Sequence, residues 1–162
     1  MKRINISIAA TPSVKTITIT NTWLSMPSVR SYDVIGFRNS TGNSIAINSV
    51  SEYQKADGQT VTYGMGGSNF KSTNQGCGIS MNIVGSVSSN LTNSISVTVI
   101  NSSSTYTAYG TYQHAQSNVT LEQSKNYSIN ASGLGGILNF ASSVKEKYDG
   151  MQGVSQTTRV GW

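Results

Sequence analysis

Apolar and uncharged polar side chains alternate one by one along much of this chain. The clearest runs are residues 4–8 (INISI), 16–20 (TITIT) and 94–99 (SISVTV). Successive side chains of an extended strand point to opposite faces, so this period gives each segment one apolar and one polar face. A helix with the same sequence would spread its apolar residues around its whole circumference. The pattern therefore restricts these segments to half-buried β-strands.

The polar side chains of these segments are almost all uncharged. Ser, Thr and Asn supply 59 of the 162 residues, whereas Asp, Glu, Lys and Arg supply 17. Hydrophobic residues make up 36% of the chain, which is low for a globular domain. However, β-branched residues and Tyr are plentiful and Pro occurs only twice, which distinguishes the chain from disordered sequences. We expect a folded protein whose exterior forms hydrogen bonds but carries little charge.

The spacing of alternating segments and turn residues predicts about nine or ten short strands. Two alternating segments flank a Ser- and Asn-rich stretch within Gly78–Val99, and this arrangement predicts a β-hairpin. The length fits a single domain over residues 1–162. The expected fold is mainly β: an antiparallel β-sandwich or barrel, a class that includes the jelly roll.

One C-terminal helix is expected beside these strands, near residues 134–148. Its apolar residues recur at spacings of three and four, a helical period: Leu134, Ile137, Leu138, Ala141, Val144 and Tyr148. Ser132 is placed to cap the start of this helix and Gly150 to end it. Residues 151–162 follow as an extended polar tail.

Reactive side chains are few and scattered. His114 is the only histidine, Cys77 is the only cysteine, and the six acidic residues form no cluster in the sequence. A hydrolytic triad would need His114 beside a marked nucleophile, and no such motif is present. A zinc or calcium site would need several closely spaced ligands. The sequence predicts no enzyme, no catalytic residue, no metal site and no cofactor.

The formal net charge of +5 is spread along the chain. Proteins that bind nucleic acid usually gather their basic residues on one face, so no specific nucleic-acid partner is expected. Lys2 and Arg3 precede an alternating segment, where a signal peptide would have an uninterrupted apolar run. No segment has the length of apolar sequence that a membrane helix requires. We therefore expect synthesis in a host cytoplasm without a signal peptide.

This profile of a short, charge-poor, strand-dominated chain without motifs is similar to that of accessory structural proteins of virions. It favours a bacteriophage component, such as a capsid decoration, head-fibre or tail protein, that acts through contacts with itself or with other virion proteins in a symmetric assembly. The chain ends supply the candidate subunit contacts: Lys2, Arg3, Val160 and Trp162. A terminal Trp buries a large area with few rotamers, which suits an anchor between subunits.

Two alternatives remain open at this level. Eight Tyr, two Trp and many Asn suit a lectin-like module that binds glycans. Less favoured is a β-pore-forming protein, in which the Gly78–Val99 hairpin would be the membrane stem, although its second arm is short for a spanning strand. The host, the oligomeric state, any ligand and the position in an assembly are not encoded in any motif of the chain.

Overall fold

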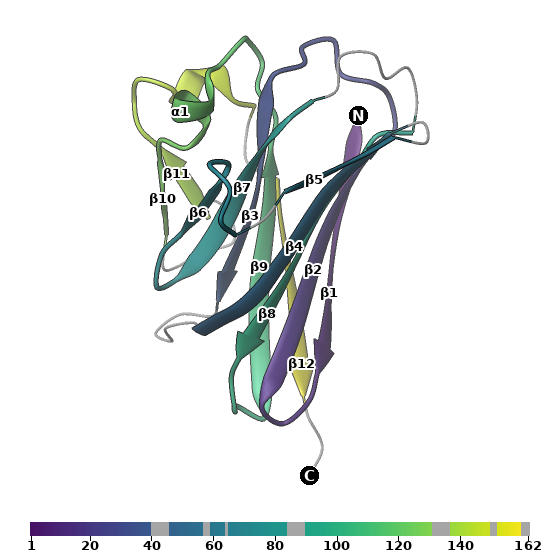
Figure 1. Cartoon of the computed structure of the whole chain (residues 1–162), viewed down its shortest axis with the longest axis vertical. Helices are drawn as coiled ribbons and strands as arrows, with labels where there is room; N and C mark the ends of the chain where they lie inside the picture. The colour runs from purple at the N-terminus through teal and green to yellow at the C-terminus, as the bar shows by residue number, and fades with distance from the viewer. Residues whose placement is uncertain are drawn as a thin grey trace.

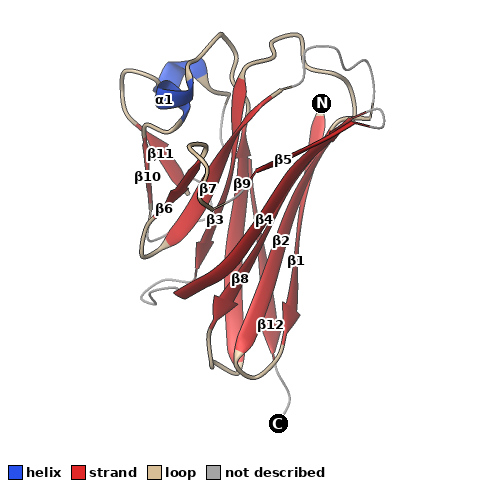
Figure 2. Cartoon of the chain, in the orientation of Figure 1, coloured by secondary structure: helices blue, strands red, loops and turns tan. Residues whose placement is uncertain are grey.

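The chain forms two five-stranded antiparallel sheets that pack face to face (Figures 1 and 2). The computed structural model describes residues 1–39, 46–56, 59–63, 65–83, 90–130, 137–149 and 152–159. The first sheet has the order β1-β2-β8-β4-β5, with bounds Lys2–Ala10, Val14–Trp23, Thr92–Ile100, Ala46–Ala56 and Gln59–Tyr63. The second sheet has the order β12-β9-β3-β7-β6, with bounds Gln152–Arg159, Thr105–Gln113, Tyr32–Asn39, Gly76–Asn82 and Phe70–Ser72. The prediction of an antiparallel β-sandwich is confirmed.

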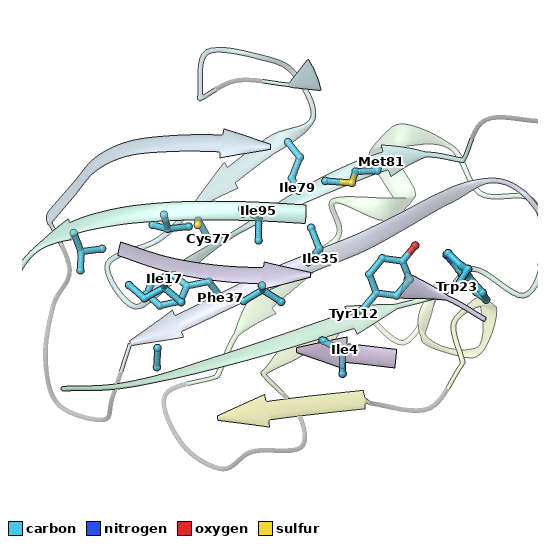
Figure 3. Packing of buried hydrophobic residues seen from close by; sticks show 14 of the residues in the cluster. Ile4, Ile17, Trp23, Ile35, Phe37, Cys77, Ile79, Met81, Ile95 and Tyr112 are labelled. Atoms are coloured by element: carbon cyan, nitrogen blue, oxygen red, sulfur yellow. The ribbon is translucent and has the colours of Figure 1, made fainter. Parts of the chain in front are cut away.

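The main core lies between the two sheets, and the alternation in the sequence determines which residues enter it. On β2, Ile17 and Ile19 are fully buried, while the threonines that alternate with them face outward. Ile95 enters the core from β8, and Phe37 and Ile79 enter it from the second sheet (Figure 3). Each such side chain gains roughly 2 kcal/mol when it leaves water, so the period-two pattern determines which face of each strand turns inward.

A smaller layer covers the outer face of the second sheet. It contains the short helix α1 (Leu121–Ser124), the two-stranded sheet β10 (Tyr127–Ile129) and β11 (Leu138–Phe140), and a 3-10 turn at Lys145–Lys147. Figure 1 shows α1, β10 and β11 beside β6 and β7. A second apolar cluster fills the space beneath this layer, with Val34 from β3 packed among Tyr127, Leu138, Phe140 and Tyr148.

Gly78 allows this layer to approach the second sheet closely. A Cβ atom at Gly78 would overlap the hydroxyl of Tyr127 and lie 3.0 Å from its Cζ atom. Tyr127 packs edge-on against Phe140, with the ring centroids 5.6 Å apart. The missing side chain at Gly78 therefore makes room for the aromatic cluster that attaches the layer to the sheet.

The prediction of a β-hairpin at Gly78–Val99 is wrong. Strand β7 lies in the second sheet between β3 and β6, and strand β8 lies in the first sheet between β2 and β4. The two segments therefore occupy opposite layers, and both turn their apolar faces into the same core. The chain crosses between sheets where a hairpin turn was expected; residues 84–89 lie outside the described part.

The prediction of a helix near residues 134–148 is also wrong, as the described residues 137–149 show. Strand β11 and the 3-10 turn occupy this segment, and Ile137, Leu138, Val144 and Tyr148 are still buried. The α-helix lies earlier, at Leu121–Ser124. Thr120 caps it: the Thr120 hydroxyl accepts from the Gln123 amide, and the Gln123 side chain accepts from the Thr120 amide. The proposed caps at Ser132 and Gly150 lie outside the described residues.

Two further segments differ from expectation. Most of the expected polar tail is strand β12, which pairs with β9 along the edge of the second sheet. Gly-rich sequence is costly to order and favours a loop, yet the Gly-rich segment 64–78 contains β6 and the start of β7. Strand β12 gains ladder hydrogen bonds from β9, a partner distant in sequence that a local pattern cannot show. Strand β6 instead pairs with the adjacent strand β7.

Candidate functional site

A buried carboxylate lies at one end of the sandwich, where β3 begins and β9 ends. Asp33 has no solvent exposure. Its Oδ2 atom accepts from the Tyr112 hydroxyl at 2.7 Å, and its Oδ1 atom accepts from the Ala115 amide at 2.9 Å. Nδ1 of His114 lies 2.9 Å from Oδ2. Four groups from two segments of the chain thus converge, and three of them make hydrogen bonds to the Asp33 carboxylate.

The environment of Asp33 pulls its pKa in opposite directions. Burial raises the pKa above its ordinary value, and this effect outweighs the others. The hydrogen bond and charge of His114 lower it, as do the hydrogen bonds from Tyr112 and Ala115. The net direction is upward, because removing a carboxylate from water costs several kcal/mol even when partners are present.

Aromatic rings and a second ion pair enclose this site. Trp23 contacts His114 edge-on, with ring centroids 4.9 Å apart, and lies at the same end of the core as Tyr112 (Figure 3). The Lys2 ammonium forms an ion pair with Asp149 and lies 5.4 Å from the Trp23 ring centroid. Asp149 also accepts from the backbone amide of His114 at 2.9 Å. The start of β1 and the segment before β12 are therefore joined to the Asp33–His114 pair.

The His114–Asp33 arrangement has two members of a catalytic triad but no third. In the described part of the chain, the side-chain hydrogen bonds of His114 go to Asp33, and none reaches a serine, threonine or cysteine. Cys77 is completely buried in the main core, and burial raises the pKa of its thiol, which makes the nucleophilic thiolate scarce. This cluster links the start of β3 to the end of β9, and no activated nucleophile lies beside it among the described residues.

Glu52 is a second buried acid, on the inner face of β4. Its exposed fraction is 1%, and neither carboxylate oxygen has a hydrogen-bond partner among the described residues. Burial raises the pKa of Glu52, which favours the neutral form in this environment. No group of three or more His, Cys, Asp or Glu residues that would hold a metal ion is found among the described residues.

The outer face of the first sheet carries rows of small uncharged side chains. We call this surface the hydroxyl face; across β1, β2 and β8 it consists of Asn5, Ser7, Ala9, Thr16, Thr18, Thr20, Thr22, Thr92, Ser96 and Thr98, together with Ser94, which is buried. Opposed residues of β2 and β8 form hydroxyl pairs, with oxygen–oxygen distances of 2.7 Å for Thr18–Ser96 and 3.2 Å for Thr16–Thr98.

The structure places two of the four predicted contact residues. The side chain of Lys2 is turned toward Trp23 and Asp149 and is only 13% exposed. Arg3 is exposed and pairs in register with Thr22, so it borders the hydroxyl face. Val160 and Trp162 lie outside the described residues. Asp33 was not among the predicted site residues, although it shares its strand face with the apolar residues Ile35 and Phe37, a pattern that marks a buried acid.

Comparison with known proteins gives distant structural matches. No protein-family model matches, and no curated protein sequence matches. The collagen-binding subdomain of the Enterococcus faecalis surface protein ACE is similar over 90% of this chain and 86% of its own, with 9% identity and a TM-score of 0.41. The collagen-binding domain of the Erysipelothrix rhusiopathiae surface protein RspB is similar over 98% of this chain and 48% of its own, with 11% identity and a TM-score of 0.44. At these TM-scores the likeness does not establish a shared function.

One further finding concerns membranes. Among the described residues, no helix combines the length and the apolar character needed to cross a bilayer.

Proposed function

We propose that this chain is a non-enzymatic structural protein that works through contacts of its hydroxyl face with neighbouring subunits. The observation that carries the proposal is the set of hydroxyl pairs that join β2 to β8, above all Thr18–Ser96 at 2.7 Å. Thr and Ser side chains are short, and the β-branch of Thr restricts its rotamers, so little conformational freedom is lost when such a surface is covered.

The hydroxyl face is complementary to itself. Each hydroxyl has one proton to donate and two lone pairs to accept. A pair such as Thr18–Ser96 uses one proton internally and leaves the other proton and several lone pairs for a partner. A second copy of the same face offers the same combination, which is what an isologous interface between identical subunits requires.

The charge distribution supports the same role. No acidic side chain belongs to the hydroxyl face, and Arg3 at its border is one of the few cations on this sheet. Contacts between neutral groups are less sensitive to salt than ion pairs, because counterions screen only the latter. A repeated assembly that uses many such contacts keeps its cohesion over a wide range of ionic strength.

Within this role we propose that the assembly is a bacteriophage virion, with the chain as a capsid decoration, head-fibre or tail protein. The composition supports this placement: the chain is short, poor in charge and rich in Ser, Thr and Asn. Purified phage particles test it directly. The proposal predicts that the chain co-sediments with particles, and its absence from particles that encode it would contradict the placement.

The contact role is tested by charging the hydroxyl face. Thr18→Lys combined with Ser96→Lys places two cations in its centre, and we expect the native mass, measured by analytical ultracentrifugation, to fall from an oligomer to a monomer. The matched control is Thr107→Lys with Thr157→Lys, because these residues form a similar exposed hydroxyl pair at 2.8 Å on the second sheet. A wild-type chain that stays monomeric at all concentrations and binds no particle would contradict the proposal.

A further inference from the structure

An open cleft of about 660 Å³ lies between strand β6 and the helix α1 that covers the second sheet. Its size is within the range of ligand sites, which is roughly 300–1,000 Å³. The residues that line it include Gln123, Asn126 and Ser143 together with two lysines, Lys71 and Lys125. The cleft is on the opposite side of the sandwich from the hydroxyl face, so it is independent of the assembly proposal.

Lys71 gives the cleft a built-in positive charge. Its ammonium donates to the backbone carbonyls of Lys125 at 2.9 Å and Tyr127 at 2.6 Å, and it lies 4.8 Å from the Tyr127 ring centroid. These contacts fix the position of the ammonium without neutralising it. Among the described residues, no carboxylate lies within ion-pair distance of Lys71 or Lys125. Burial and the neighbouring Lys125 both lower the pKa of Lys71, so an anion would stabilise its charged form.

The remaining walls match the chemistry of a sugar. The Asn126 amide both donates and accepts, and Ser143 adds a hydroxyl, which suits the hydroxyls of a pyranose ring. The Gln123 oxygen already accepts from the Thr120 amide, so this side chain offers its amide nitrogen as a donor. The exposed Glu122 at the rim is the one acidic side chain among the residues that line this cleft. The two lysines therefore outnumber the acid.

A second hollow of about 320 Å³ shares Asn126 with the first. It is lined on its other sides by residues of β10 and β11, including Tyr127, Asn139 and Phe140. Because both hollows are lined by Asn126, they are neighbours and together have room for two consecutive sugar units.

From these observations we propose that the cleft binds an acidic oligosaccharide, with the sugar carboxylate beside Lys71 and Lys125 and the next sugar unit beyond Asn126. The sequence suggested glycan binding without a site. The cleft is such a site, and its two lysines require that the glycan carry negative charge. A uronic acid disaccharide is the simplest ligand with this chemistry.

The test is calorimetric titration of the full chain at low salt with a galacturonic acid disaccharide and with the neutral galactose disaccharide. We expect the acidic sugar to bind at least about tenfold more tightly than the neutral one. Binding of the acidic sugar should weaken as the ionic strength rises toward about 0.5 M, because salt screens the lysine charges. Equal binding of both sugars, or no binding of either, would overturn the proposal.

Variants separate a specific site from general attraction to a basic protein. Lys125→Gln and Asn126→Ala remove side chains that make no hydrogen bond within the described chain, so the fold should persist while affinity for the acidic disaccharide falls by about fivefold or more. Lys55→Gln, at an exposed position on β4 of the first sheet, is the matched charge control and should bind normally. An equal loss with Lys55→Gln would overturn the proposal. So would a glutamate-rich peptide, or acetate alone, that binds as tightly as the sugar.

Discussion

Nδ1 of His114 lies 2.9 Å from Oδ2 of Asp33, a carboxylate with no solvent exposure at the end of a largely aliphatic core. The two residues are 81 positions apart and come from β3 and the end of β9. The carboxylate also accepts from the Tyr112 hydroxyl and the Ala115 amide. One buried acid thus determines how these two strand ends meet.

Asp33→Asn tests the strength of this junction. The amide loses the charge and one of the acceptor oxygens, so at least one buried donor is left without its partner. We expect the free energy of unfolding to fall by about 3 kcal/mol. Urea denaturation at neutral pH measures the change. Asp149→Asn is the control: because the Asp149 side chain is 19% exposed, its replacement should lower the free energy of unfolding by less. If Asp33→Asn lowers the free energy of unfolding no more than Asp149→Asn does, the proposed role of Asp33 in joining β3 to β9 would be contradicted.

Glu52→Gln should stabilise the protein in a pH-dependent way. Burial raises the pKa of Glu52 above its ordinary value of 4.5, so the folded state holds the proton more tightly than the unfolded state. The contribution of Glu52 to stability is then greatest below that ordinary value and is lost as the pH rises through the folded pKa. Glutamine keeps the neutral form at every pH, so the variant should gain stability at pH 8 and differ little at pH 4.

Urea denaturation over this pH range gives the measurement for Glu52→Gln. Glu122→Gln is the matched control, because Glu122 is exposed on helix α1. We expect this control to show no comparable difference between pH 4 and pH 8. A Glu52→Gln variant that is less stable than the wild type at pH 8 would show that the carboxylate has a partner that stabilises its charge.

Gly78→Ala should loosen the layer that covers the second sheet. The added methyl would overlap the Tyr127 hydroxyl, and the ring can move only by disturbing its contact with Phe140. We expect a loss of roughly 1–3 kcal/mol in the free energy of unfolding. Gly66→Ala is the control, because a Cβ atom at Gly66 has no heavy atom within 4 Å. Similar stability for the two variants in thermal or urea unfolding would contradict the packing described here.

The alternation in the sequence predicted the sandwich because it reports which face of a strand is buried. It does not report which strand is the neighbour. Ile79 and Ile95 both point into the same core, and this is equally true of a hairpin and of two strands in opposite sheets. The choice depends on packing between segments far apart in the chain, so the pairing of β7 and β8 was predicted incorrectly.

The error at 134–148 has a related cause. Ile137, Leu138, Val144 and Tyr148 are buried as their apolar character predicts, but they cover the second sheet from a short strand and a 3-10 turn. Their helical spacing is a coincidence that tertiary contacts override. Of the candidate sites, the hydroxyl face followed directly from the period-two pattern, whereas the Asp33–His114 pair and the cleft beside Lys71 depend on long-range contacts.

The hydroxyl pairs between β2 and β8 should contribute little to the stability of the isolated chain. Thr18 and Ser96 are partly exposed, so a water molecule can take the place of the lost hydroxyl as a hydrogen-bond partner when either residue is changed. In a double-mutant cycle with Thr18→Val and Ser96→Ala, we expect a coupling energy of about 0.5 kcal/mol. The Thr16–Thr98 pair, at 3.2 Å, should couple more weakly in the matching cycle with valine at both positions. Coupling well above about 1 kcal/mol for Thr18–Ser96 would assign these hydroxyls to holding the sheet together and would weaken the case that they serve a partner.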